Sequence, residues 1–227
     1  MKDFKFVIFL ILLLGPFLII RPVLDFYLDF NIEHGLLMSF IKFAILATLG
    51  EVIGLRIRTG RYMQKGFGII PRAFVWGFLG ITIKIAFDIF AAGTPVFLEK
   101  SGMENASQII TGDLSFKKVL VAFSISTAIN LFYAPVMMTA HKITDTHIYK
   151  TGGTIKGFFG RMAVLSILKE IDWNTHWNFI LKRTIPIFWI PAQTITFLLP
   201  AEFRVLFAAF LGIVLGVLLA IASLKGR

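Results

Sequence analysis

Five ionisable side chains lie inside otherwise apolar stretches of the sequence: Lys42, Glu51, Arg72, Lys84 and Asp88. A charge inside a membrane span is costly, so such residues usually pair, face a water-filled cavity or snorkel to the surface. Glu51 and Arg72 are expected at a similar shallow depth, and Lys84 and Asp88 can pair four residues apart on one helix face. These residues are candidates for the lining of a polar pathway. The alternative is that the bases snorkel and the acids only neutralise them.

Uncharged polar side chains extend this candidate lining: Asn130, Gln193 and Thr196. Asn130 belongs to a helical face of small and polar residues that ends near Pro135. Gln193 and Thr196 follow Pro191 in a broken apolar stretch, where polar groups can line a cavity. The same residues can also serve hydrogen bonds between helices without any lumen, which is the alternative interpretation.

The sequence indicates no catalytic machinery. The absence of cysteine excludes disulfides, thiolate catalysis and cysteine-based zinc or iron–sulfur sites. Gly-x-Ser-x-Gly, HExxH and phosphate-binding glycine motifs are absent too. His141, Asp145 and His147 are close together, but in an expected loop they are a weak metal-binding set. We therefore predict no enzyme activity, no catalytic residues, no cofactor and no metal.

The elements that must position these side chains are membrane-spanning helices. The chain has 227 residues, is 57% hydrophobic and contains 25 phenylalanines, more than the core of a soluble domain needs. A helix of about 20 apolar residues crosses a bilayer. Stretches of this kind lie at about 4–24, 36–55, 67–92, 116–140, 184–199 and 203–224. We predict a single all-α membrane domain over 1–227, a polytopic bundle of about six transmembrane helices, whose short fifth segment is broken or re-entrant.

Lysines and arginines cluster on one side of this six-span arrangement. This pattern predicts that both termini are cytoplasmic, because basic residues collect in cytoplasmic loops. The net charge of +10 is then explained by topology and by contact with membrane lipids, and no nucleic-acid partner is needed. The first stretch resembles a signal peptide but lacks a cleavage site of small residues, so we interpret it as an uncleaved span kinked at Gly15 and Pro16.

Residues 155–169 combine apolar positions at helical spacing with Lys156, Arg161 and Lys169. This pattern is typical of an amphipathic helix that lies in the membrane interface. A linker helix packed on the bundle would have a similar pattern, so both interpretations stay open.

Small residues recur every four positions in the second and sixth stretches: Gly50, Gly54, Ala208, Gly212, Gly216 and Ala220. Such faces let two helix backbones approach closely. The partner is either another helix of this chain or a second copy, so a homo-oligomer also stays open.

The last two stretches contain a recognisable string: Trp189, Gln193, Phe197, Pro200 and Arg204. It resembles the C-terminal signature of the Mpv and twenty-two kilodalton peroxisomal membrane protein family. Pro200 is expected to end the fifth span, and Arg204 to bond the carbonyls freed there.

Earlier pairs fit the same family pattern: Gly50 with Glu51, Arg58 with Arg61, Pro71 with Trp76, and Ala134 with Pro135. The chain departs from it where Thr196 replaces an asparagine and where Ile129 and Asn130 replace Asp and Gln. The resemblance implies a distant member that forms a channel or transport pathway for small hydrophilic solutes. The absence of a transit-peptide pattern favours a bacterial plasma membrane, with the mitochondrial inner or peroxisomal membrane as alternatives. A non-transporting scaffold that assembles through the small-residue faces is the alternative function.

Overall fold

The computed structural model describes residues 2–225, and the regular structure in that range is helical. The helices are α1 (Lys2–Ile19), α2 (Arg21–Glu33), α3 (Gly35–Thr59), α4 (Ile69–Lys100), α5 (Ala106–Ile109), α6 (Phe116–Phe132), α7 (Ala134–Lys150), α8 (Ile155–Phe158), α9 (Val164–Glu170), α10 (Trp173–Thr175), the π-helix η1 (His176–Trp189), α11 (Ile190–Leu198) and α12 (Ala201–Lys225). This confirms the all-α prediction for the described residues.

Within residues 2–225, three helices are long and apolar enough to cross a membrane: α3, α4 and α12. Two bent pairs raise this number to five, namely α1 with α2, bent by 77°, and α6 with α7, bent by 45°. The fifth predicted stretch, 184–199, is not among them. The apolar helices are therefore compatible with an integral membrane protein of three to five spans by length and composition.

The breaks in the bent pairs coincide with prolines. The sharp turn after α1 falls at Ile20, which is extended, and Pro22 occupies the first turn of α2. The kink expected at Gly15 and Pro16 is therefore displaced: Pro16 is accommodated inside α1, whereas the chain breaks at Ile20, which places Pro22 in the first turn of α2, where its missing N–H is tolerated. Pro135 similarly lies in the first turn of α7.

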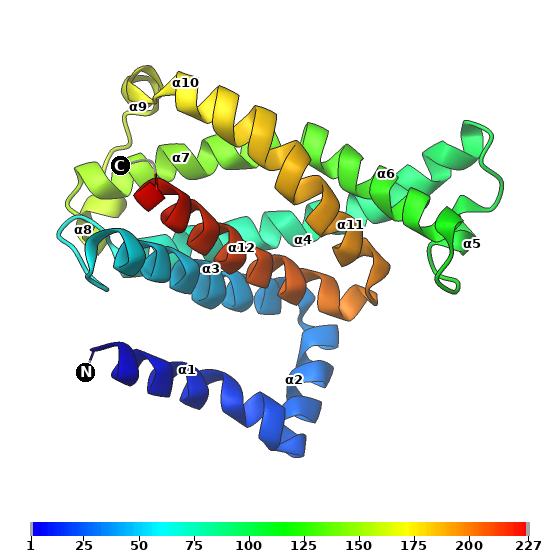
Figure 1. Cartoon of the computed structure of the whole chain (residues 1–227), viewed down its shortest axis with the longest axis horizontal. Coiled ribbons are helices and arrows are strands. Elements are labelled where there is room, and N and C mark those ends of the chain that lie inside the picture. The colour runs from blue at the N-terminus through cyan, green and yellow to red at the C-terminus, as the bar shows by residue number, and fades with distance from the viewer. Residues whose placement is uncertain (1, 226–227) are drawn as a thin grey trace.

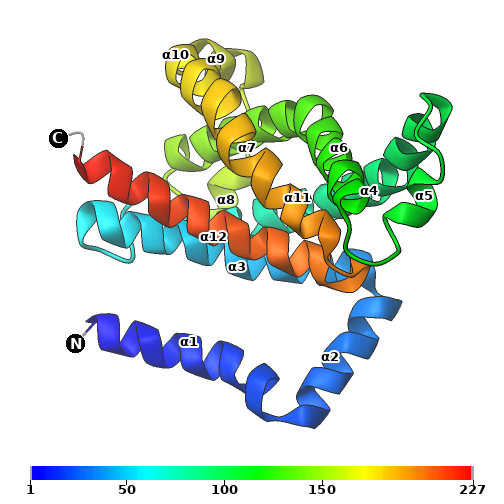
Figure 2. The ribbon, with the colours of Figure 1, turned by 45° about the vertical axis from the view of Figure 1, so that its right-hand side comes forward.

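The long helices form one bundle whose two ends differ. In Figures 1 and 2, the start of α1, the loop 60–68, α8 and the end of α12 lie at the same end, which we call the basic end. The α11–α12 turn and α5 lie at the opposite end. In both views the ribbon of α1 lies apart from the other long helices; α2 joins it to α3, and Asp3 at its start pairs with Arg56 of α3 at 2.8 Å.

The helix α3 packs against both α4 and α12, and glycines allow this close packing. A Cβ atom built on Gly50 would lie 2.9 Å from Cα of Ile213, and one on Gly216 would lie 3.3 Å from the carbonyl oxygen of Gly50. Gly54 also faces Gly216, with Ala220 alongside. The small-residue faces of the two helices thus pack against each other within the chain.

At Gly80, helix α4 approaches the backbone of α3 closely. Replacement of Gly80 by alanine is expected to lower the free energy of unfolding by about 1–3 kcal/mol through overpacking. The new Cβ would lie 2.5 Å from the carbonyl oxygen of Ser39 and 2.7 Å from Cβ of Phe43. Gly93 of the same helix has no such neighbour within 4 Å, so Gly93→Ala should raise stability by about 0.5–1 kcal/mol. Denaturation in detergent, followed by circular dichroism, compares the two variants; equal changes would contradict the close approach.

The amphipathic segment after α7 is not one helix. The four residues of α8 and the seven of α9 are separate, and residues 159–163 lie between them. Gly157 and Gly160 account for part of this interruption, because glycine weakens a helix interior. Phe159 and Leu165 expose 68% and 77% of their surface beside Lys156 and Arg161, so the exposed apolar and basic character expected there is present without the continuous helix.

Another pair of glycines joins the start of α4 to the chain after α7. Gly68 and Gly153 have φ values of 66° and 70°, in the left-handed region that glycine adopts readily. A Cβ on Gly153 would lie 2.6 Å from the backbone nitrogen of Gly68. This backbone contact fixes the basic end of α4 against the end of α7.

Candidate functional site

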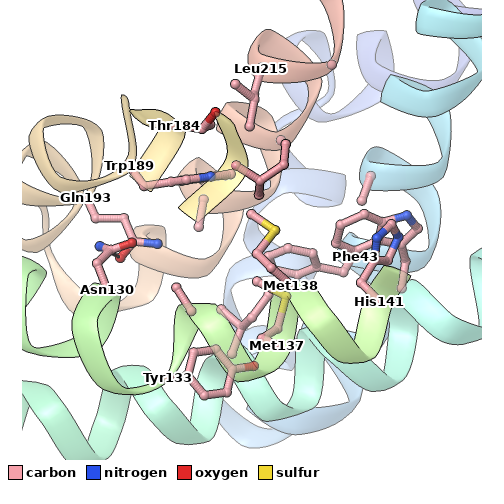
Figure 3. A pocket seen from close by; sticks show the side chains of 18 of the residues that line it. Phe43, Asn130, Tyr133, Met137, Met138, His141, Thr184, Trp189, Gln193 and Leu215 are labelled. Atoms are coloured by element: carbon pink, nitrogen blue, oxygen red, sulfur yellow. Dashed lines mark hydrogen bonds between the residues drawn. The ribbon is translucent and has the colours of Figure 1, made fainter. Parts of the chain in front are cut away.

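A cavity of about 210 Å³ lies among α3, α4, α6, α7, η1, α11 and α12 (Figure 3). Its wall is mainly apolar and includes Phe43, Met137, Met138 and Leu215. Polar groups reach it from several helices: Glu51, Trp76, Asn130, Tyr133, His141, Thr184, Trp189 and Gln193. An internal, mostly apolar cavity with a few convergent polar groups is typical of a small-molecule site.

A charge cluster occupies the end of the cavity at which His141 lies. Glu51 accepts a hydrogen bond of 2.8 Å from the indole nitrogen of Trp76, and its carboxylate lies 3.2 Å from Nε2 of His141. Arg72 pairs with both Glu51 and Asp145, so that one guanidinium lies between two carboxylates. Its Nε also donates to the carbonyl of Phe67, at 2.6 Å. The cluster joins α3, α4 and α7 through a single guanidinium that two carboxylates share.

Two amides meet on the α6 and α11 side of the cavity (Figure 3). Nδ2 of Asn130 donates to Oε1 of Gln193 and to the carbonyl of Ser126, each at 2.9 Å. The Ser126 hydroxyl donates to the carbonyl of Ile190, at 2.7 Å. Asn130 is only 1% exposed, yet its Oδ1 atom has no hydrogen-bond partner, and neither has Nε1 of Trp189.

The wide turns of η1 bring Trp189 to this cavity. Ile180, Thr184 and Trp189 all line it, although Ile180 and Trp189 are nine residues apart. Nine residues make two and a half turns of an α-helix, at about 3.6 residues a turn, and would face opposite sides. Hydrogen bonds from residue i to i+5, as from Ile190 back to Ile185, make each turn wider, so that nine residues make about two turns.

Several sequence candidates lie away from the cavity. Lys42 donates to Oδ1 of Asn31, and Lys84 pairs with Asp88 at 2.5 Å. The Thr196 hydroxyl donates to the carbonyl of Ala192 in its own helix. Arg72 lies behind Glu51 and is not part of the wall. A single lining that includes all the intramembrane charges is therefore not formed, because most of these charges already have nearby partners.

The string that resembles the Mpv signature has two structural roles. Trp189 and Gln193 line the cavity. Phe197 is fully buried against Phe87, with ring centroids 5.0 Å apart. Arg204 donates to the carbonyls of Leu199 and Phe197, at 3.0 and 3.4 Å, around the Pro200 turn. This confirms the expectation that Arg204 satisfies carbonyls freed where the helix ends.

Sequence reasoning missed the contribution of α7 to the site. His141 and Asp145 were assigned to a loop, but α7 continues to Lys150 and directs both towards the charge cluster. The recurrence of Met138, His141 and Asp145 at steps of three and four was the available signal. His147 bonds the carbonyl of Phe158, and no metal-binding group of three or more His, Cys, Asp or Glu residues occurs within residues 2–225.

Acidic groups outside the predicted spans have local partners. The Lys150 ammonium lowers the pKa of Glu170, and hydrogen bonds from Thr175 lower the pKa of Asp172, which caps α10. These residues connect surface segments and do not contribute to the cavity.

Fold and site together define an all-helical protein whose apolar helices, compatible with integral membrane insertion, surround an internal cavity. Comparison with protein-family models, with curated proteins and with solved structures found no match to this chain.

Proposed function

We propose that this chain is an integral membrane protein that gives small solutes a pathway across the bilayer, with the cavity as its solute site. The observation that carries this proposal is the cavity itself, into which Glu51, Asn130 and Gln193 project from α3, α6 and α11. A structural bundle gains stability by filling such a space, since empty volume forfeits packing contacts. A cavity with polar groups is instead what a solute site requires.

The proposed topology has about six spans, with both termini on the cytoplasmic side of a bacterial plasma membrane. The basic end is then the cytoplasmic end, in line with the clustering of Lys and Arg there. The broken segment 184–199 serves as the fifth span, and its irregular backbone is tolerated because it borders the cavity. The resemblance to the Mpv family supports the same type of function.

The composition of the cavity wall restricts which of the small hydrophilic solutes expected from the sequence can bind. Most of the cavity surface is apolar, so a strongly hydrated solute would lose water without replacement. Small uncharged solutes fit this wall better than ions do.

The alternative of a membrane scaffold has less support. The scaffold hypothesis requires that the small-residue helix faces are free to pack against a second copy of the chain. Gly50 and Gly54 instead pack on Gly216 and its neighbours within the chain, and Gly212 borders the cavity. These faces are therefore occupied without any oligomer.

Release of solutes from liposomes tests the pathway. Purified protein should release neutral solutes such as urea and glycerol faster than empty liposomes, and larger solutes such as sucrose much less. Gly212→Leu should reduce release to the level of empty liposomes, because its side chain enters the cavity, where a Cβ meets nothing within 4 Å. Gly93→Leu is the matched control, since Gly93 is equally unobstructed but does not line the cavity. Wild-type release no faster than that from empty liposomes would refute the proposal.

A further inference from the structure

We infer that the cavity binds an uncharged molecule with an apolar body and a single polar head that both donates and accepts a hydrogen bond, as a primary carboxamide does. This inference rests on the proposed function and specifies the substrate class of the same site. Three observations carry it: the pairing of every charge in the cluster with a partner inside the cluster, the two unpartnered polar atoms of wall residues, and the apolar remainder of the wall.

The charge cluster offers an ionic ligand no charged group that lacks an ion-pair partner, and its one guanidinium is shared by two carboxylates. One carboxylate oxygen of Glu51 accepts from Trp76 and lies near His141, and the other pairs with Arg72. Arg72 is shared in turn with Asp145. An anion in the mainly apolar cavity would lose its hydration without gaining a counter-charge, and a cation would have to compete with Arg72 and Trp76 for the oxygens of Glu51.

The unpartnered atoms determine the chemistry of the head. Asn130 uses its Nδ2 on Gln193 and Ser126, which leaves Oδ1 as a buried acceptor without a donor. Nε1 of Trp189 is a buried donor without an acceptor. Both residues line the cavity, and Figure 3 shows both at the side away from His141. A head that donates to Asn130 and accepts from Trp189 satisfies both groups at once.

The rest of the wall suits an apolar body. Met137 and Met138 are flexible and fill irregular gaps around ligands of different shape. Leu215 and Gly212 face them from α12. The volume of about 210 Å³ exceeds the roughly 150 Å³ of an apolar cavity known to take benzene, so a substituted ring fits.

Binding of three brominated probes tests the inference. Trp76 and Trp189 border the cavity, so a bound bromine quenches their fluorescence. Full-length protein in nanodiscs is titrated with 4-bromobenzamide, 4-bromobenzoate and 4-bromotoluene. A parallel titration of protein-free nanodiscs that contain an indole-labelled lipid measures the quenching due to partition of each probe into the lipid, and this quenching is subtracted. The amide should bind roughly tenfold more tightly than the toluene, which lacks the head, and the benzoate should not bind.

Two variants locate the binding. Asn130→Leu should bring the amide and the toluene to similar affinity, because the buried acceptor is gone. Gly212→Leu should abolish quenching by both, whereas Gly93→Leu should leave it unchanged, which keeps the test valid if Asn130→Leu fails to fold. Equal affinity of the amide and the toluene for the wild type, or tight binding of the benzoate, overturns the inference. Solute release without amide preference refutes only the ligand class, and amide binding without release refutes only the pathway.

Discussion

Arg72→Met lowers the free energy of unfolding by about 3–5 kcal/mol, because it leaves buried carboxylates without their counter-charge. Arg72 is the only cation that pairs with both Glu51 and Asp145 among the described residues, and its side chain is 10% exposed. Denaturation of the purified protein in detergent, monitored by circular dichroism, measures the loss. The double variant Arg72→Met with Glu51→Gln should recover part of it, since one uncompensated charge is then removed.

Lys84→Met is the matched control for this prediction. It removes an ion pair of the same type, but the side chain of Asp88 is 61% exposed and the pair lies four residues apart on one helix. Such a pair on an outer helix face contributes less than a buried one, so the loss should be smaller than that for Arg72→Met. A loss for Arg72→Met as small as that for Lys84→Met would mean that the charge cluster does not stabilise the bundle.

Gly153→Ala is expected to lower the free energy of unfolding by about 2–5 kcal/mol. The left-handed backbone costs an alanine about 1–2 kcal/mol. The new Cβ, 2.6 Å from the backbone nitrogen of Gly68, forces a shift that costs about 1–3 kcal/mol more. Backbone atoms cannot rotate away as a side chain can, so the strain has no easy release.

Gly152 offers a control one residue away. Its φ of 73° matches that of Gly153, but a Cβ there meets nothing within 4 Å. Gly152→Ala should therefore lower the free energy of unfolding only by the cost of the left-handed backbone, about 1–2 kcal/mol. The difference between the free energies of unfolding of the two variants, measured by denaturation in detergent, gives the cost of disturbing the contact between the loop after α7 and the start of α4. Equal losses would show that this contact is loose.

Hydropathy predicted the long helices because membrane insertion depends on the same apolar content. The second predicted span, 36–55, lies within α3, and the third, 67–92, overlaps most of α4. The similar depth predicted for Glu51 and Arg72 agrees with their ion pair. Counting residues from a span end is enough for such a prediction, because the rise per residue in a helix is constant.

The composition of the cavity was harder to predict. Hydropathy falls near residue 140, so the sequence predicts His141 outside the span. Helix α7 nevertheless continues to Lys150. A drop in apolar content does not by itself end a helix. The π-helical turns of η1 depend on hydrogen-bond register, which apolar periodicity does not report. The position of Trp189 in the cavity wall therefore depends on backbone geometry that only the folded chain reveals.

The pairing of Glu51 with Arg72 also bears on how the chain enters a bilayer during synthesis. The two residues belong to consecutive helices, α3 and α4, joined only by residues 60–68. An unpaired arginine costs about 2.5–3.5 kcal/mol at the centre of a single inserting helix, and less at the shallow depth expected for Arg72. Helix α3 is synthesised before Arg72, so Glu51 is already present as its counter-charge. In the proposed membrane protein, insertion of α3 and α4 together as a hairpin therefore lowers the cost of placing Arg72 in the bilayer. Asp145 follows later in the chain, with α7, and completes the charge cluster through its pair with Arg72.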